Sequence, residues 1–76
     1  MEEMLRFLVK ELVNDPDQIS INKREDGNTT TLELKVAPDD MGKVIGRQGK
    51  IAKSIRTLMK AYGAKNNQKI NVDILD

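Results

Sequence analysis

The sequence is 76 residues long, with 13 Lys and Arg, 12 Asp and Glu, no His and no Cys. This length suits one domain over residues 1–76, and a domain so small buries only about 60 % of its unfolded surface. Lack of Cys excludes disulfides, thiolate metal sites and thiol nucleophiles. Lack of His removes the usual general base, so neither Ser20 nor Ser54, the only serines, has an activating partner. We expect a protein that is not an enzyme and that carries no metal or cofactor.

The charge is unevenly distributed, although the net charge is only +1. Residues 1–40 hold ten acidic and five basic residues, residues 41–72 hold eight basic and no acidic residue, and Asp73 and Asp76 follow. Such asymmetry indicates a polyanionic partner. Chance clustering of charge on a solvated face is the alternative.

The first eight residues, MEEMLRFL, are acidic where a secretory signal peptide is basic. No apolar run approaches the roughly 20 residues that a membrane-spanning helix needs. We therefore expect a cytoplasmic protein.

The first half of the chain predicts a helix followed by a hairpin. Four apolar residues share one helical stripe: Leu5, Leu8, Val9 and Leu12. A helix over 2–13 would end before Asn14-Asp15-Pro16, because the residue before a proline avoids helical backbone angles. Two segments alternate with the period of a strand: Ile19 and Ile21, then Leu32, Leu34 and Val36. Asp26-Gly27 between them is a strong hairpin signal, and Pro38 ends the second strand.

The second half predicts two helices and a strand. Asp39 or Asp40 is placed to cap a short helix carrying Met41, Val44 and Ile45. Beyond the interruption at residues 46–49, a longer helix has an apolar face: Ile51, Ile55, Leu58 and Tyr62, with Ala52 and Met59 beside them. Gly63 is a natural stop for that helix, and residues 64–68 are expected to form a loop. A last strand is predicted by the alternation of Ile70, Val72 and Ile74. Phe7, Met59 and Tyr62 are expected in the core.

The element order is therefore α-β-β-α-α-β, which predicts an α+β domain of two layers with three helices on one face of a three-stranded sheet. Because the last strand follows two helices, we expect it to pair in parallel with a hairpin strand and to make the sheet mixed.

Gly46-Arg47-Gln48-Gly49 is the most informative segment. Its two glycines permit a tight turn and leave the backbone bare, so that another backbone can approach closely. The turn opens onto a helix N-terminus, where unpaired N–H groups and the helix dipole favour phosphate. Arg47 adds a fork of donors suited to phosphate, and Lys43 and Lys50 flank it. An interhelical turn with a solubilising Arg is the alternative. The P-loop and dinucleotide fingerprints both fail at Val44.

Val44-Ile45-Gly46-Arg47-Gln48-Gly49, together with the element order, resembles a KH domain of type II, and the likeness covers the whole chain. The length and the stretch GRQGKIAKSIRT resemble the small bacterial KhpA family. In KH domains, a G-x-x-G loop clamps about four nucleotides of single-stranded RNA. The resemblance implies a clamp at residues 46–49 and an apolar groove floor at Val44 and Ile45. It also implies an opposite wall, reading base edges, at residues 35–37, and a variable loop at residues 25–29. Ala52 departs from the larger aliphatic residue that many KH domains carry there.

The residues expected to contact RNA are therefore Lys35, Val36, Ala37, Lys43, Val44, Ile45, Gly46, Arg47, Gln48, Gly49, Lys50 and Lys53. Lys53, Arg56 and Lys60 recur on the face of the last helix away from Ile51 and Ile55, where they either extend a basic track or form an ordinary solvated face.

Resemblance to the KhpA family further implies an RNA chaperone or post-transcriptional regulator linked to cell shape and cell-wall growth. It implies a homodimer, a heterodimer with a larger KH-containing protein of the KhpB type, or both. One candidate dimer surface is the short second helix with Gly42 and the loop. The alternative function is a KH-fold dimerisation adaptor whose RNA contact is weak or supplied by its partner. Single-stranded DNA is the alternative ligand, because phosphate clamping alone does not detect a 2′-hydroxyl.

Overall fold

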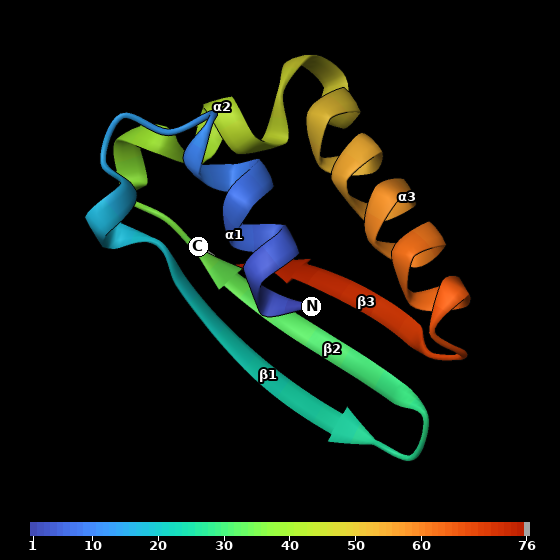
Figure 1. Ribbon diagram of the computed structural model, residues 1–76. Coiled ribbons are helices and arrows are strands. Elements are labelled where there is room, and N and C mark those ends of the chain that lie inside the picture. Colours follow the sequence, from blue (N-terminus) through green and yellow to red (C-terminus); the bar gives the residue numbers. More distant parts are fainter. Residues whose placement is uncertain (76) are drawn as a thin grey trace.

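The computed structural model describes residues 1–75. It has two layers, a layer of helices packed on a β-sheet (Figure 1). The helices and strands follow in the order α1 (Glu2–Lys10), β1 (Ser20–Asp26), β2 (Thr29–Lys35), α2 (Met41–Ile45), α3 (Lys50–Lys65) and β3 (Lys69–Ile74). Short 3₁₀ turns occupy Pro16–Gln18, Pro38–Asp40 and Arg47–Gly49. The predicted order α-β-β-α-α-β is confirmed. Asp76, the last acidic residue of the sequence, lies outside the described residues.

The sheet has the strand order β1-β2-β3, with β1 and β2 antiparallel and β2 and β3 parallel. The hairpin closes at the pair Asp26–Thr29, and Gly27 takes the positive φ of 64° that the turn requires. The mixed sheet is thus confirmed. The strand β2 ends at Lys35, so the prediction that it includes Val36 was one residue too long.

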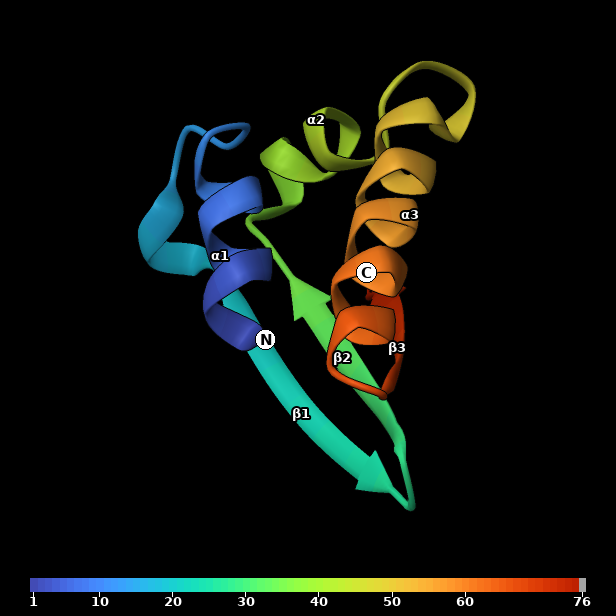
Figure 2. The same cartoon turned by 45° about the vertical axis from the view of Figure 1, so that its right-hand side comes forward.

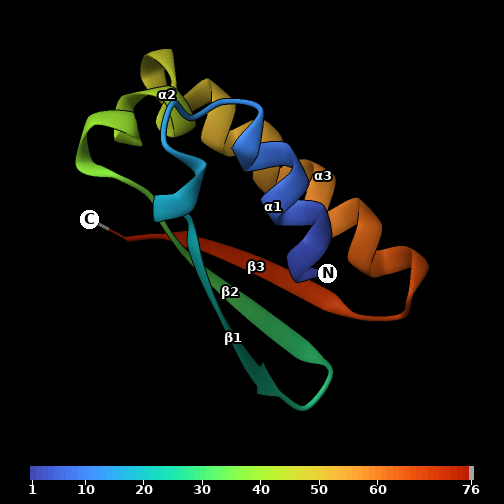
Figure 3. The same ribbon diagram turned by 60° about the vertical axis from the view of Figure 1, so that its left-hand side comes forward.

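Both long helices lie on the same side of the sheet, as Figure 2 and Figure 3 show. Burial alternates accordingly along β2, where Thr30, Leu32 and Leu34 are buried beneath the helices. The buried apolar core is Leu5, Val9, Ile19, Leu32, Leu34, Val36, Val44, Ala52, Ile55, Met59, Ile70 and Val72. No helix covers the opposite face of the sheet among the described residues, and its side chains there are polar.

The helix α1 ends at Lys10, three residues before the predicted end, and the chain then turns at Glu11 and Leu12. Leu5 and Val9 point into the core, whereas Phe7 is 55 % exposed, so its predicted core position was wrong. Two residues along an α-helix correspond to a rotation of about 200°, which directs Phe7 away from the stripe of Leu5 and Val9.

The buried stripe of α3 is Ala52, Ile55, Met59 and Gly63, next to the predicted one. Ile51 and Tyr62 are half-buried, and Leu58 is 54 % exposed. The prediction failed at Leu58 because hydrophobicity alone does not identify small residues as the contact face. Gly63 lies inside the helix rather than ending it: a Cβ there would stand 2.7 Å from Cγ1 of Ile70, so glycine is what lets β3 lie this close.

No helix within residues 1–75 is both long enough and apolar enough to cross a membrane.

Candidate nucleic-acid interface

The loop between α2 and α3 is a tight turn whose backbone uses the left-handed region three times. Gly46 has φ 76° and ψ 176°, Gln48 has φ 57° and ψ 25°, and Gly49 has φ 74° and ψ 13°. Gly49 N–H donates to the Gly46 carbonyl at 3.2 Å, and Gly46 N–H donates to the Gly42 carbonyl at 2.9 Å. The loop lies at the end of the molecule opposite the β1–β2 turn (Figure 2).

The two glycines of the loop have different surroundings. A Cβ on Gly46 would stand 2.6 Å from Cγ1 of Ile51, so a side chain is excluded there by packing. A Cβ on Gly49 would meet nothing within 4 Å. Gly46 therefore serves the fold, whereas the bare backbone at Gly49 faces open space and is accessible to a ligand.

The start of α3 has an electrostatic character suited to an anion. Gly49 is its N-cap, and no side chain caps this end of the helix. The amides of Gly49 and Lys50 donate to the carbonyls of Gly46 and Arg47, and the positive end of the helix dipole lies at the loop. The side chains of Arg47, Gln48, Lys50 and Lys53 are exposed. The structure thus brings together four of the predicted contact residues, the bare loop and a helix N-terminus.

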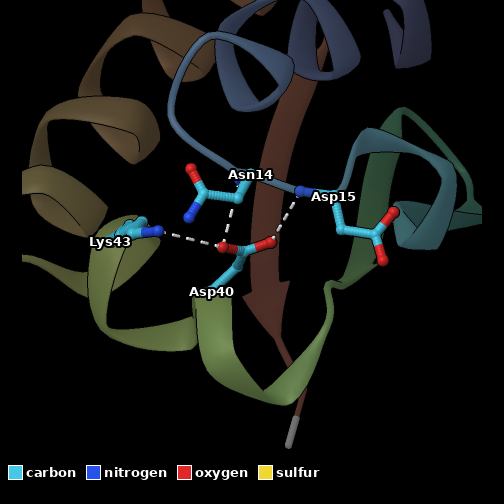
Figure 4. Close-up of polar contacts among 4 residues, drawn as sticks. All are labelled: Asn14, Asp15, Asp40 and Lys43. Carbon is cyan, nitrogen blue, oxygen red and sulfur yellow. Dashed lines mark hydrogen bonds and ion pairs between the residues drawn. The ribbon is translucent and has the colours of Figure 1, made fainter.

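Lys43 is directed elsewhere, since its Nζ lies 3.4 Å from Oδ1 of Asp40 (Figure 4). Asp40 is only 2 % exposed, and its two carboxylate oxygens accept the backbone N–H groups of Asn14 at 3.1 Å and Asp15 at 3.0 Å. The hydrogen bond from Asn14 lowers the pKa of Asp40, as do the bond from Asp15 and the ammonium of Lys43, against the opposing effect of burial. The positive charge of Lys43 is therefore partly neutralised by Asp40, which makes Lys43 a weaker phosphate contact.

Asp40 also differs from its predicted role as a helix cap, because its side chain makes no capping bond to α2. It fastens the segment that follows α1 to the start of α2. Sequence reasoning missed this link, and a contact across 25 and 26 residues leaves no local signal. Within residues 1–75, no three acidic side chains are grouped so that they could hold a metal ion.

The predicted groove floor and wall are only partly available. Val44 is fully buried in the core, while Ile45 is 37 % exposed beside the loop. Lys35 is exposed and Val36 is buried. Because β2 is the central strand, its backbone groups are paired with both neighbours up to Lys35 opposite Ser20 and Leu34 opposite Ile74. Val36 and the half-buried Ala37 follow the end of β2, outside the paired part of the strand, so the base-reading wall at residues 35–37 stays a prediction.

The free edge of the sheet beside α3 belongs to β3. The amides of Lys69 and Leu75 donate to carbonyls of residues 28 and 34, so the alternate residues Ile70, Val72 and Ile74 direct their backbone groups outward. The outward carbonyl of Val72 accepts a hydrogen bond from Nε of Arg56 at 3.2 Å. Arg56 is therefore partly engaged, while Lys53 and Lys60 on the same helix are exposed.

Residues 2–74 match the protein family described as KhpA/KhpB, KH domain. Curated relatives have the name RNA-binding protein KhpA. The one from Clostridium acetobutylicum is 47 % identical over 75 residues, which are 99 % of this chain and 100 % of the relative. The one from Listeria monocytogenes is 46 % identical over 76 residues and covers 100 % of both chains. The one from Borreliella burgdorferi is 46 % identical over 74 residues, 97 % of this chain and 90 % of the relative.

Two solved structures share the fold. A variant of Aquifex aeolicus Era bound to GDP and AlF4⁻ superposes with a TM-score of 0.64 at 17 % identity. Era in complex with MgGDPNP and nucleotides 1506–1542 of 16S ribosomal RNA superposes with a TM-score of 0.57, also at 17 % identity. The match covers 95 % of this chain but only 28 % of each Era chain, so the likeness concerns one domain of those proteins.

Proposed function

The chain belongs to the KhpA/KhpB KH-domain family, and on that premise we propose that it binds single-stranded RNA through the loop Gly46–Gly49. One observation carries the assignment to this loop. The backbone is bare and open at Gly49, and that position lies between the exposed side chains of Arg47, Gln48 and Lys50. A sugar-phosphate backbone can approach this surface more closely than any surface covered by Cβ atoms.

In the proposed complex, Arg47 donates to phosphate oxygens at the positive end of the α3 dipole, and Lys50 and Lys53 add positive charge. Bases then lie along Ile45, toward α3 and β3. The outward backbone groups of β3, the edge strand, form a wall that reads base edges together with residues 35–37. With only one Tyr and one Phe in the chain, this recognition depends on aliphatic contact and backbone hydrogen bonds rather than on aromatic stacking.

Changing the charge of the loop from positive to negative tests the proposal. The double variant Arg47→Asp, Gln48→Asp places two carboxylates where phosphate is expected. A matched variant, Lys10→Asp with Gln18→Asp, makes the same charge change at exposed positions of α1 and the following 3₁₀ turn. After circular dichroism has verified folding, fluorescence anisotropy with a single-stranded RNA should show at least a tenfold loss for the loop variant and a much smaller loss for the matched one. Equal affinities for the two variants would contradict the proposal, and a parallel series with DNA of the same sequence measures the preference for RNA.

A second function, self-association, is favoured by a separate observation. Met4, Leu8, Leu58, Ala61 and Tyr62 line an apolar hollow of about 260 Å³ between α1 and α3. We propose that a second copy of this chain covers it, since Glu2 and Glu3 in the first turn of α1 of one copy can then face the basic helix α3 of the other. This surface differs from the predicted one around Gly42, so self-association need not compete with RNA. Leu58→Glu should make the protein monomeric in sedimentation equilibrium while RNA affinity is retained, and an unchanged mass would exclude this surface.

Family membership extends the proposal to the cellular level. We propose an RNA chaperone or post-transcriptional regulator that acts in the cytoplasm on cell shape and cell-wall growth, alone or paired with a larger KH-containing protein of the KhpB type. The proposed activity binds RNA and makes or breaks no covalent bond.

A further inference from the structure

A second basic surface, distinct from the loop, lies at the free edge of β3. Three residues from three strands stand in one row on the uncovered face of the sheet, since Arg24 pairs with Thr31 and Thr31 with Asn71. Arg56 and Lys60 of α3 line the same hollow, which has a volume of about 380 Å³ and also includes Asp73. We call these six residues the basic hollow. It contains three cations and one carboxylate.

The fold does not use all of this positive charge. Arg56 commits its Nε to the carbonyl of Val72 at 3.2 Å, which leaves the Nη groups of the guanidinium available. Arg24 is paired with Glu33 at 2.9 Å, yet its side chain is 64 % exposed. Among the described residues, Lys60 and Asp73 take part in no ion pair. Removing Lys60 should therefore cost the fold little, and its charge is available to a ligand.

The donors of the hollow match a phosphate group. Guanidinium and ammonium groups form charge-assisted hydrogen bonds with phosphate oxygens, and the Asn71 amide and Thr31 hydroxyl supply neutral donors beside them. We propose that the basic hollow binds a backbone phosphate of the RNA strand, some nucleotides beyond the part held by the loop. This inference rests on the proposed function of the loop and names a second contact for the same ligand.

The spacing of charges along α3 supports a continuous path from the loop to the hollow. Lys50, Lys53, Arg56 and Lys60 are separated by three, three and four residues, so they follow one side of the helix. From Lys50 to Lys60 the helix rises about 15 Å. A strand of about four nucleotides, which fills a KH clamp, would end before the hollow, whereas one of about twelve nucleotides would reach it.

The test compares a short and a long RNA, of about four and about twelve nucleotides, with the full chain. The double variant Arg24→Ala, Lys60→Ala leaves Arg56 and its bond to Val72 intact. The matched variant Lys10→Ala, Lys23→Ala removes the same charge from α1 and β1. We expect the hollow variant to bind the long RNA about tenfold more weakly and to bind the short RNA as the wild type does. For the long RNA, the slope of the logarithm of affinity against the logarithm of salt concentration should become shallower by about 1. Long RNA alone should shift the amide resonances of Arg24 and Thr31.

Other results overturn the inference. If the hollow variant binds both RNAs as the wild type does, or loses affinity for both equally, the hollow holds no additional phosphate of RNA. If inorganic phosphate shifts Arg24 and Thr31 while long RNA does not, the ligand is free phosphate. If a polyglutamate peptide loses affinity for the variant and long RNA does not, the ligand is an acidic protein segment. Failure of the loop proposal is seen separately, as short-RNA binding that is unaffected by Arg47→Asp, Gln48→Asp.

Discussion

Three glycines near the loop differ in backbone conformation and in surroundings, and their replacement by Ala separates the contribution of each. Gly46 and Gly49 both have positive φ, but only Gly46 is packed against another side chain. Gly42 lies within α2, has no positive φ, and would place a Cβ in open space. The series therefore contains a packed and strained position, an open and strained position, and an open and unstrained control.

The structure gives each substitution its own expected change in the free energy of unfolding. Gly46→Ala forces a backbone region that costs about 1–3 kcal/mol, and its Cβ meets Ile51 at 2.6 Å, which adds about 1–3 kcal/mol of overpacking. Gly49→Ala should cost only about 1–2 kcal/mol, the free energy of placing a residue with a Cβ in the left-handed backbone region. Gly42→Ala should stabilise the protein by about 0.5–1 kcal/mol, because alanine in a helix is favoured over glycine.

RNA affinity should follow a different order. The Cβ of Gly49→Ala stands where the RNA backbone is proposed to approach, so we expect a loss of roughly tenfold, equal to about 1.4 kcal/mol. Gly42→Ala should bind RNA as the wild type does. Urea denaturation measures the stabilities, and anisotropy with a single-stranded RNA measures the affinities, at a temperature where all variants are folded.

Two results would refute this reasoning. If Gly46→Ala is no less stable than Gly49→Ala, the contact with Ile51 does not constrain the loop. If Gly49→Ala binds RNA with unchanged affinity, the bare backbone at that position is not the contact surface, and the G-x-x-G spacing serves only the turn between the helices.

Three further predictions concern charge and packing. Because the Asn14 N–H group holds the pKa of Asp40 below its ordinary value of 3.8, the carboxylate stabilises the fold above that pH, and this stabilisation is lost as the pH falls through the lower pKa of the folded state. Asp40→Asn should therefore lower the melting temperature at pH 7, and the difference from the wild type should shrink below pH 3.8. A difference that stays constant with pH would contradict a stabilising role for the bonds from the Asp40 carboxylate to the amides of Asn14 and Asp15. Gly63→Ala should destabilise by about 1–3 kcal/mol in urea, despite the better helix propensity of alanine, because its Cβ meets Ile70 at 2.7 Å; a stabilised variant would show that β3 can move away. The logarithm of the RNA affinity should fall against the logarithm of salt with a slope of roughly −3 for about four phosphates, and a slope near zero would exclude phosphate as the main contact.

The element order was predictable because each segment carries its own periodicity. The Asp26-Gly27 turn, the alternation on either side of it and the break at Gly46–Gly49 are local features, and the structure places elements accordingly. Parallel pairing of β3 followed from the two helices that precede it, which give the chain enough length to return in the same direction.

What the sequence could not provide depends on contacts between distant segments. Leu58 is apolar and at helical spacing from Ile51 and Ile55, yet the buried face of α3 includes Ala52 and Gly63 instead, and at Gly63 the lack of a side chain lets β3 approach. The exposure of Phe7, by contrast, follows from its position about 200° around α1 from Leu5. The engagement of Asp40 with Asn14 spans 26 residues. The row of Arg24, Thr31 and Asn71 exists only through strand register. The position of β3 at a free edge of the sheet likewise depends on the strand order, which hydrophobic periodicity does not encode.

The most direct test of the central claim is a titration of the ¹⁵N-labelled protein with a single-stranded RNA, followed by the amide resonances of the whole chain. Binding at the loop predicts that the largest shift changes occur at residues 46–53 and at the outward edge of β3. Changes confined to β1, or to the apolar hollow between α1 and α3, would contradict it.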